Sequence, residues 1–122
     1  MTLYLFGSQA RGKTGPLSDY DFAVQSVPGL SAAKRFHLKL QLMDRLSRIL
    51  RTDAVDVVLL EDASPLLAHR VLKDARIVFC RNQKSRIRSE FHTLTSYLDF
   101  SDDLQFYAQA TLGLPPSGVV HG

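Results

Sequence analysis

Apolar runs and turn residues divide the chain into alternating short strands and longer helices. Apolar residues that recur every three or four positions predict helices, whereas short apolar or alternating runs predict strands. The predicted strands are Leu3–Phe6, Asp19–Val24, Ala54–Leu60 and Ala75–Arg81, the last at a sheet edge. The predicted helices are Ser31–Arg51, Ser64–Asp74 and Asn82–Phe100, with one or two helical turns at Ser8–Gly12. This order predicts an α/β (α+β) fold in which helices back a small mixed sheet, with a C-terminal helical extension.

Each predicted helix carries an apolar stripe, and in the first two helices we expect the stripe to face the core. The stripes are Phe36, Leu40, Met43, Leu46 and Leu50, then Leu66, Leu67, Val71 and Leu72, and finally Ile87, Phe91, Leu94 and Leu98. The first helix would act as a crossover that delivers strand 54–60 beside strand 19–24. Ser101–Asp103 can cap a further short helix that ends at Gly113. We therefore expect one domain over residues 1–100 and a short helix with a flexible tail over residues 101–122.

Composition narrows the class of protein. With 122 residues and 45% hydrophobic residues, the chain can form one modest core. The formal net charge of +3 is a mild excess that permits contact with a polyanion without demanding it, so we do not expect direct nucleic-acid binding. The single cysteine, Cys80, excludes an internal disulfide framework and suits a reducing compartment. Neither a membrane span nor a signal peptide is recognisable, and we expect a cytoplasmic protein.

The first predicted strand ends at a glycine and a serine that could form a phosphate-binding turn. Gly7 is free in φ and Ser8 is a good helix N-cap, so the chain would pass from a strand directly into a helix. Such a turn directs unpaired N–H groups and the positive end of a helix dipole outward, which suits a phosphate. Glycine followed by serine is also common in ordinary turns, so the pair alone does not choose between these roles.

Two carboxylates alternate with aromatic residues in the second predicted strand. In a strand, Asp19 and Asp21 leave one face of the sheet, while Tyr20 and Phe22 leave the other. Two carboxylates about 4 Å apart repel each other by about 1 kcal/mol in water and about 4 kcal/mol at an effective dielectric near 20. Mg²⁺ relieves such repulsion, because it takes one or two carboxylates and completes its shell with water and phosphate oxygens. An isolated pair of this kind can also be a solvated strand end.

A third carboxylate, Asp56, lies within the apolar run from Ala54 to Leu60. A lone charge there would be costly if it were buried and unpaired, so its presence requires a reason. If this strand lies beside strand 19–24, three carboxylates converge and could hold two metal ions that bridge nucleotide phosphates. A phosphate-binding turn, a metal pair and a third acid together indicate phosphoryl or nucleotidyl transfer.

Gly7-Ser8 followed by Asp19-Tyr20-Asp21 resembles the signature of the polymerase-β-type nucleotidyltransferases. The fuller string GSQARG…SDYDFAV, with VDVVLL downstream, is similar to the minimal nucleotidyltransferase (MNT) branch, whose members are antitoxins paired with HEPN-domain toxins. The resemblance extends from about Leu3 to Phe100. Members of the family generally have a helix before the first strand, so either that helix is absent here or the true start lies upstream of this sequence. Its loss would leave part of the sheet uncovered. We expect a neighbouring subunit or the toxin to cover that face.

The resemblance implies a Mg²⁺-dependent adenylyltransferase of a type VII-like toxin–antitoxin pair. It would transfer AMP from ATP to a tyrosine of a cognate HEPN toxin, an RNase, and so neutralise the toxin. Two Mg²⁺ ions would be held by Asp19, Asp21 and Asp56. Asp56 could also take the acceptor proton, while Gly7 and Ser8 would bind the β and γ phosphates. Arg11 would stabilise charge on the leaving pyrophosphate, or it could form a structural ion pair instead.

Other functions stay open at this stage. The chain could be an antitoxin that masks its toxin without catalysis, or a nucleotidyltransferase for a small molecule such as an aminoglycoside. An RNA-binding module would have to depend on weakly basic helix faces alone. The string from Gly7 to Thr14 also matches a P-loop, but Gly15 and Pro16 would stop the long helix that a P-loop needs. The four histidines show no metal-ligand spacing.

Overall fold

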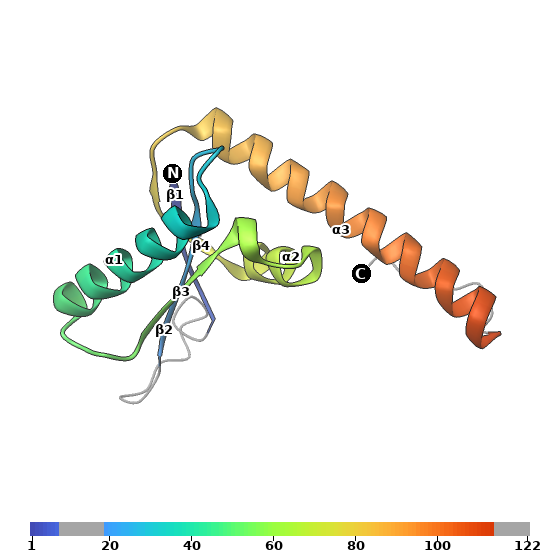
Figure 1. Ribbon diagram of the computed structural model, residues 1–122, viewed down its shortest axis with the longest axis horizontal. Coiled ribbons are helices and arrows are strands. Elements are labelled where there is room, and N and C mark those ends of the chain that lie inside the picture. The colour runs from blue at the N-terminus through green and yellow to red at the C-terminus, as the bar shows by residue number, and fades with distance from the viewer. Residues whose placement is uncertain (8–18, 114–122) are drawn as a thin grey trace.

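The computed structural model describes residues 1–7 and 19–113, and its strands form one mixed sheet of four (Figure 1). The strands are β1 (Thr2–Phe6), β2 (Tyr20–Gln25), β3 (Val55–Leu59) and β4 (Arg76–Cys80), in the spatial order β3-β2-β1-β4. β1 pairs antiparallel with β2 and with β4, whereas β3 pairs parallel with β2. The predicted mixed sheet, with the last strand at an edge, is thus confirmed.

Four helical segments complete the fold, and three of them begin at the predicted positions, directly after a residue whose side chain caps the helix. They are α1 (Ala32–Leu50), the 3-10 turn η1 (Leu60–Asp62), α2 (Pro65–Asp74) and α3 (Gln83–Leu112). The capping residues are Ser31, Ser64 and Asn82. Each side chain accepts a hydrogen bond from the backbone N–H of the residue three positions later. Each bond satisfies an N–H that would otherwise have no partner in the first helical turn.

The sheet lies between α1 and α2, so its two faces have separate cores (Figure 1). On the α1 face the buried residues are Leu3, Phe22, Val24, Val55, Val57 and Leu59. On the α2 face they are Tyr4, Ala23, Leu60, Ala68 and Val71. The alternation of neighbours such as Phe22 and Ala23 between the two faces is what the period of a strand requires. In the described ranges, no helix combines the length and the hydropathy that a membrane span needs.

The face of α1 that packs on the sheet differs from the predicted apolar stripe. Phe36 and Leu40 are exposed, Phe36 at 60%, while Leu38 and Leu42 pack against the core in their place. Arg35 explains this difference, because its side chain donates to the Leu30 carbonyl and forms an ion pair with Asp62 at 2.9 Å. These contacts fix the first turn of α1 with Arg35 on its inner side. Met43, Leu46 and Leu50 do pack inward as predicted.

Small residues position α2. Ala68 and Val71 are buried against the sheet, whereas Leu66 and Leu67, which we expected in the core, are exposed. Leu72 packs partly against the same cluster, as predicted. A small side chain at Ala68 lets the helix approach the strands closely, and this leaves no room for both leucines beneath it.

α3 is one helix of 30 residues, and the predicted break after Phe100 is wrong. No glycine or proline lies between Gln83 and Leu112, so the polar residues Ser101–Asp103 are tolerated inside the helix. Gly113 ends it in the left-handed conformation, with φ of 67°, as predicted. α3 packs against α2, where the rings of Tyr97 and His69 stack with their centroids 3.9 Å apart.

The edge strand β4 is open to solvent. Ile77, Val78 and Phe79 are each about half exposed. Phe79 pairs with Leu3 on the α1 face, so α1 does not cover the sheet as far as β4. This agrees with the expectation that part of the sheet is left uncovered.

Candidate active site

Asp21 and Asp56 are direct neighbours across two parallel strands. Asp21 of β2 pairs in register with Asp56 of β3, so both side chains leave the same side of the sheet. Tyr20 and Phe22 pack into the core on the opposite face. Adjacent strands lie about 4.8 Å apart, which brings the two carboxyl groups close to each other. The predicted convergence of these two acids from separate strands is therefore observed.

The electrostatics of Asp21 reflect its neighbours. Partial burial, then the negative charge of Asp56 and then that of Asp19, raise the pKa of the Asp21 carboxyl. The negative charges of Asp56 and Asp19 thus disfavour the ionised form of Asp21. Asp56 is exposed and accepts a hydrogen bond of 2.9 Å from the backbone N–H of Val57. A cation placed among these groups would remove the repulsion.

Gly7 lies directly against the carboxylate of Asp21. It follows β1, whose last residue, Phe6, pairs with Asp21, and its φ of 76° is in the left-handed region. A Cβ at Gly7 would lie 2.6 Å from Asp21 Oδ2, a distance that real side chains do not adopt. Only glycine therefore lets the backbone turn at this point while it stays in contact with the acid. Ser8 and Arg11, the other predicted phosphate-binding residues, lie outside the described residues.

The donor set fits a hard divalent cation. Asp21 and Asp56 supply carboxylate oxygens, and the negative charge of Asp56 adds to partial burial in raising the pKa of Asp21. Within residues 1–7 and 19–113, no three acidic, histidine or cysteine side chains are already gathered into a metal cage. The observed pair, Asp21 and Asp56, is enough for Mg²⁺, which takes one or two carboxylates and fills its shell with water and substrate phosphates.

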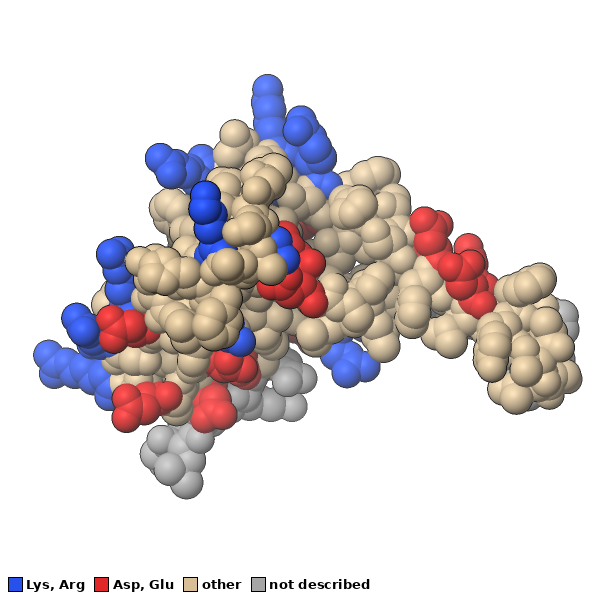
Figure 2. All heavy atoms as spheres, in the orientation of Figure 1, with Lys and Arg blue, Asp and Glu red and all other residues tan. Residues whose placement is uncertain are grey.

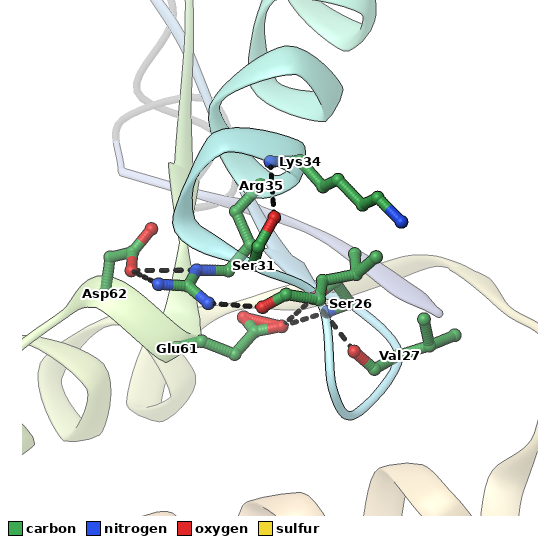
Figure 3. Close-up of polar contacts among 8 residues, drawn as sticks. Ser26, Val27, Ser31, Lys34, Arg35, Glu61 and Asp62 are labelled. Carbon is green, nitrogen blue, oxygen red and sulfur yellow. Dashed lines mark hydrogen bonds and ion pairs between the residues drawn. The ribbon is translucent and has the colours of Figure 1, made fainter.

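Two further acids, Glu61 and Asp62, lie at the opposite end of the parallel strands (Figure 3). At the end of a strand and before a helix, acids of this kind could be auxiliary catalytic groups or could serve the positive N-terminus of the helix. Instead, Glu61 accepts hydrogen bonds from the backbone N–H and the hydroxyl of Ser26, and Asp62 pairs with Arg35. These contacts hold the end of β2 and the start of α1 to η1. They are structural and lie away from the three aspartates.

A hollow of about 550 Å³ lies beside Glu61, and sequence patterns did not predict it. Its walls combine the end of β2, η1 and the first part of α3, with Gln25, Leu60, Arg88, Ser89, His92 and Thr93 among the lining residues. Only tertiary packing joins these segments, so no motif could have revealed it. It opens at the far end of β2 from Asp21.

The mixed sheet thus carries a glycine turn against Asp21, which pairs with Asp56 on the adjacent strand. The family described as "Polymerase beta, Nucleotidyltransferase" matches residues 1–84, and the chain belongs to this family. A comparison with curated proteins finds no match.

Solved structures narrow the likeness to MNT antitoxins, as the sequence resemblance predicted. A chain of a toxin–antitoxin complex with AMP-PNP shares 26% identity with this protein at a TM-score of 0.62, covering 93% of this chain and 83% of the other. A second is from a complex of tri-AMPylated Shewanella oneidensis HEPN toxin with MNT antitoxin, at 26% identity and a TM-score of 0.59, covering 93% and 80%. A third, from the MntA–HepT complex, shares 25% identity at a TM-score of 0.55, with the same coverage as the second.

Proposed function

We propose that this protein is an antitoxin that transfers AMP from ATP to a tyrosine hydroxyl of a cognate HEPN toxin and thereby neutralises it. The observation that carries the proposal is the pairing of Asp21 with Asp56 beside Gly7, in a chain of the nucleotidyltransferase family. A similar chain occurs in a complex whose HEPN toxin is AMPylated, and another in a complex with AMP-PNP. Both support adenylyl transfer to a protein as the chemistry.

In this proposal Asp19, Asp21 and Asp56 would hold two Mg²⁺ ions. The metal would neutralise the triphosphate and stabilise charge that develops on the transferred phosphoryl group. Gly7 contributes a turn without a side chain, so that phosphates can approach the backbone beside Asp21. Ser8 and Arg11 would add a hydroxyl and a cation for the β and γ phosphates.

The proposed transfer forms one bond, breaks one bond and moves one proton. The toxin's hydroxyl oxygen forms a bond to the α phosphorus of ATP, and the bond from that phosphorus to the bridging oxygen of pyrophosphate breaks. The hydroxyl proton passes to a carboxylate, and Asp56 is exposed and therefore accessible to an incoming acceptor. Pyrophosphate leaves with the electron pair of the broken bond.

The decisive experiment is the intact mass of the cognate HEPN protein after incubation with this chain, ATP and Mg²⁺. We expect the wild-type chain to add one or more AMP groups, and the Asp19→Asn/Asp21→Asn variant to add none. Asp62→Asn is the matched control, because Asp62 pairs with Arg35 at the other end of the parallel strands. It should retain full transfer. Unchanged modification by the double variant would refute the catalytic proposal.

The same variant separates catalysis from simple masking. If cells that express the toxin are rescued as well by Asp19→Asn/Asp21→Asn as by wild type, the antitoxin acts by binding alone. The proposal predicts that rescue falls with transfer, while complex formation persists.

A further inference from the structure

The second half of α3 extends beyond the body of the molecule as an arm, which we define as residues 99–112 (Figure 1). At a rise of 1.5 Å per residue these 14 positions span about 21 Å. Most of its apolar side chains are exposed, with Leu104 at 51%, Tyr107 at 60% and Phe106 at 74%. An unsupported helix of this length is only marginally stable in water, so the arm needs a surface to pack against.

One face of the arm continues the face by which α3 packs on its own domain. Along that face, Glu90 accepts from the Tyr4 hydroxyl at 2.9 Å and Tyr97 stacks on His69. Further steps of three and four residues lead to Phe100, Leu104 and Tyr107, which all lie beyond the domain. We call these three the inner face of the arm.

The start of α2 adds an apolar residue near the base of the arm. α2 and α3 run antiparallel, since His69 meets Tyr97 while Leu72 and Lys73 lie by Glu90 and Thr93. The N-terminal turn of α2 therefore points toward the place where α3 leaves the domain. Leu66 in that turn is exposed. An apolar partner could contact the arm and this turn together.

The charges of the arm differ from those of the rest of the chain. All 15 Lys and Arg residues lie at or before Arg88, whereas the arm carries Asp99, Asp102 and Asp103 and no basic residue. Figure 2 shows acidic and no basic side chains on the extended part of this face, whereas the body of the molecule carries both kinds. A partner for the arm should therefore present apolar side chains with Lys or Arg around them.

We infer that the inner face of the arm is the docking surface for the HEPN toxin. By binding there, the toxin would be held beside the antitoxin's active site for modification. This inference rests on the proposed function. The structural matches support the HEPN toxin as the partner that docks here, because each match covers 93% of the 122 residues. The uncovered remainder is shorter than the 30-residue α3, so at least part of α3 lies within the match to these chains of toxin–antitoxin complexes. A second copy of this chain is disfavoured, because two arms would bring their acidic residues together.

The test compares alanine variants on two faces of the arm. Leu104→Ala/Tyr107→Ala removes the inner face, while Phe106→Ala removes the most exposed of these apolar side chains from another face of the helix. Alanine favours helix, so neither change should unfold the arm. Affinity for the cognate HEPN protein is measured by titration calorimetry, and AMP transfer is followed at increasing toxin concentration.

We expect the inner-face variant to weaken binding at least tenfold and to raise KM for the toxin with kcat retained, while Phe106→Ala behaves as wild type. Hydrogen exchange at amides 100–112 should be fast in the free chain and slow in the complex. Equal effects of the two variants, or none, would overturn the inference, as would a dimer of this chain alone that the inner-face variant abolishes. If the wild-type chain binds the toxin but never modifies it, the proposed activity fails while the docking surface stands.

Discussion

Replacing Asp21 with asparagine should make the free protein more stable at neutral pH. Asp21 is partly buried and lies beside Asp56 and near Asp19, and its burial, followed by these two charges, raises the pKa of its carboxyl. A carboxylate whose pKa is raised on folding costs stability when it is ionised. Asparagine keeps the shape of the side chain and removes the charge, so the variant should lose activity and gain stability.

The size of the gain follows from the spacing of the strands. Two unit charges about 4.8 Å apart repel by about 0.9 kcal/mol in water and about 3.5 kcal/mol at an effective dielectric of 20. Asp56 is exposed, so the lower figure applies, and we expect about 1 kcal/mol. For a chain of 122 residues this raises Tm by about 3–6 °C.

The stability gained by replacing Asp21 with asparagine should depend on pH. Above the raised pKa, wild-type Asp21 is charged and bears the full cost. As pH falls through that pKa toward the ordinary value of 3.8, the carboxyl becomes protonated and the advantage of asparagine disappears. The gap between the two melting curves should therefore be widest near pH 7 and close under acidic conditions.

Thermal melts of wild type, Asp21→Asn and Asp103→Asn, without metal, provide the assay. Asp103 is an exposed carboxylate of α3, so its replacement should leave Tm nearly unchanged. Mg²⁺ should then raise Tm of the wild type by more than that of Asp21→Asn, because binding to the folded state stabilises it. A variant that melts below wild type at neutral pH would show that the carboxylates do not repel one another, and would refute the reasoning.

Two other substitutions test the local geometry. Gly7→Ala should lower the free energy of unfolding by about 2 kcal/mol or more and impair AMP transfer, because φ is 76° at Gly7 and the new Cβ would meet Asp21. Gly29→Ala is the matched control: φ is 86° but the space around it is open, so the variant should lose only about 1 kcal/mol of stability and keep AMP transfer intact. Equal losses of stability and activity in the two variants would argue against close contact at Gly7. Tyr4→Phe should cost about 1 kcal/mol in denaturant unfolding, because the buried hydroxyl donates to Glu90 at 2.9 Å, and an unchanged midpoint would contradict that role.

Local signals predicted most of the fold. Side-chain caps at Ser31, Ser64 and Asn82 act over three residues, so they are legible in the sequence and they mark the helix starts well. The crossover rule placed β3 beside β2 for a similar reason, since a single helix of suitable length connects them. These features depend on little beyond neighbouring residues.

Features that depend on distant contacts were predicted less well. The rotation of α1 follows from the contact of Arg35 with Asp62, which is 27 positions away. The stripe of α1 was ambiguous because apolar residues occur on more than one of its faces. In α3, Ser101–Asp103 have the chemistry of caps, but they cannot end a helix that nothing in the backbone interrupts.

The candidate site was likewise predictable from the sequence only in part. The period of a strand was enough to place Asp21 on the face opposite Tyr20 and Phe22, and the apolar run around Asp56 marked it as unusual. The register that sets Asp56 beside Asp21 and the approach of Gly7 to Asp21 both arise from pairing across the sheet. No local pattern encodes that pairing.

The most direct test is a crystal structure of this chain with AMP-PNP and Mn²⁺, which substitutes for Mg²⁺ and can be located by its anomalous scattering. The account predicts Mn²⁺ in contact with oxygens of Asp19, Asp21 and Asp56, at about 2.0–2.2 Å, with the nucleotide phosphates beside Gly7. Metal bound elsewhere, for instance at Glu61, or bound by the triphosphate without the three aspartates, would contradict it.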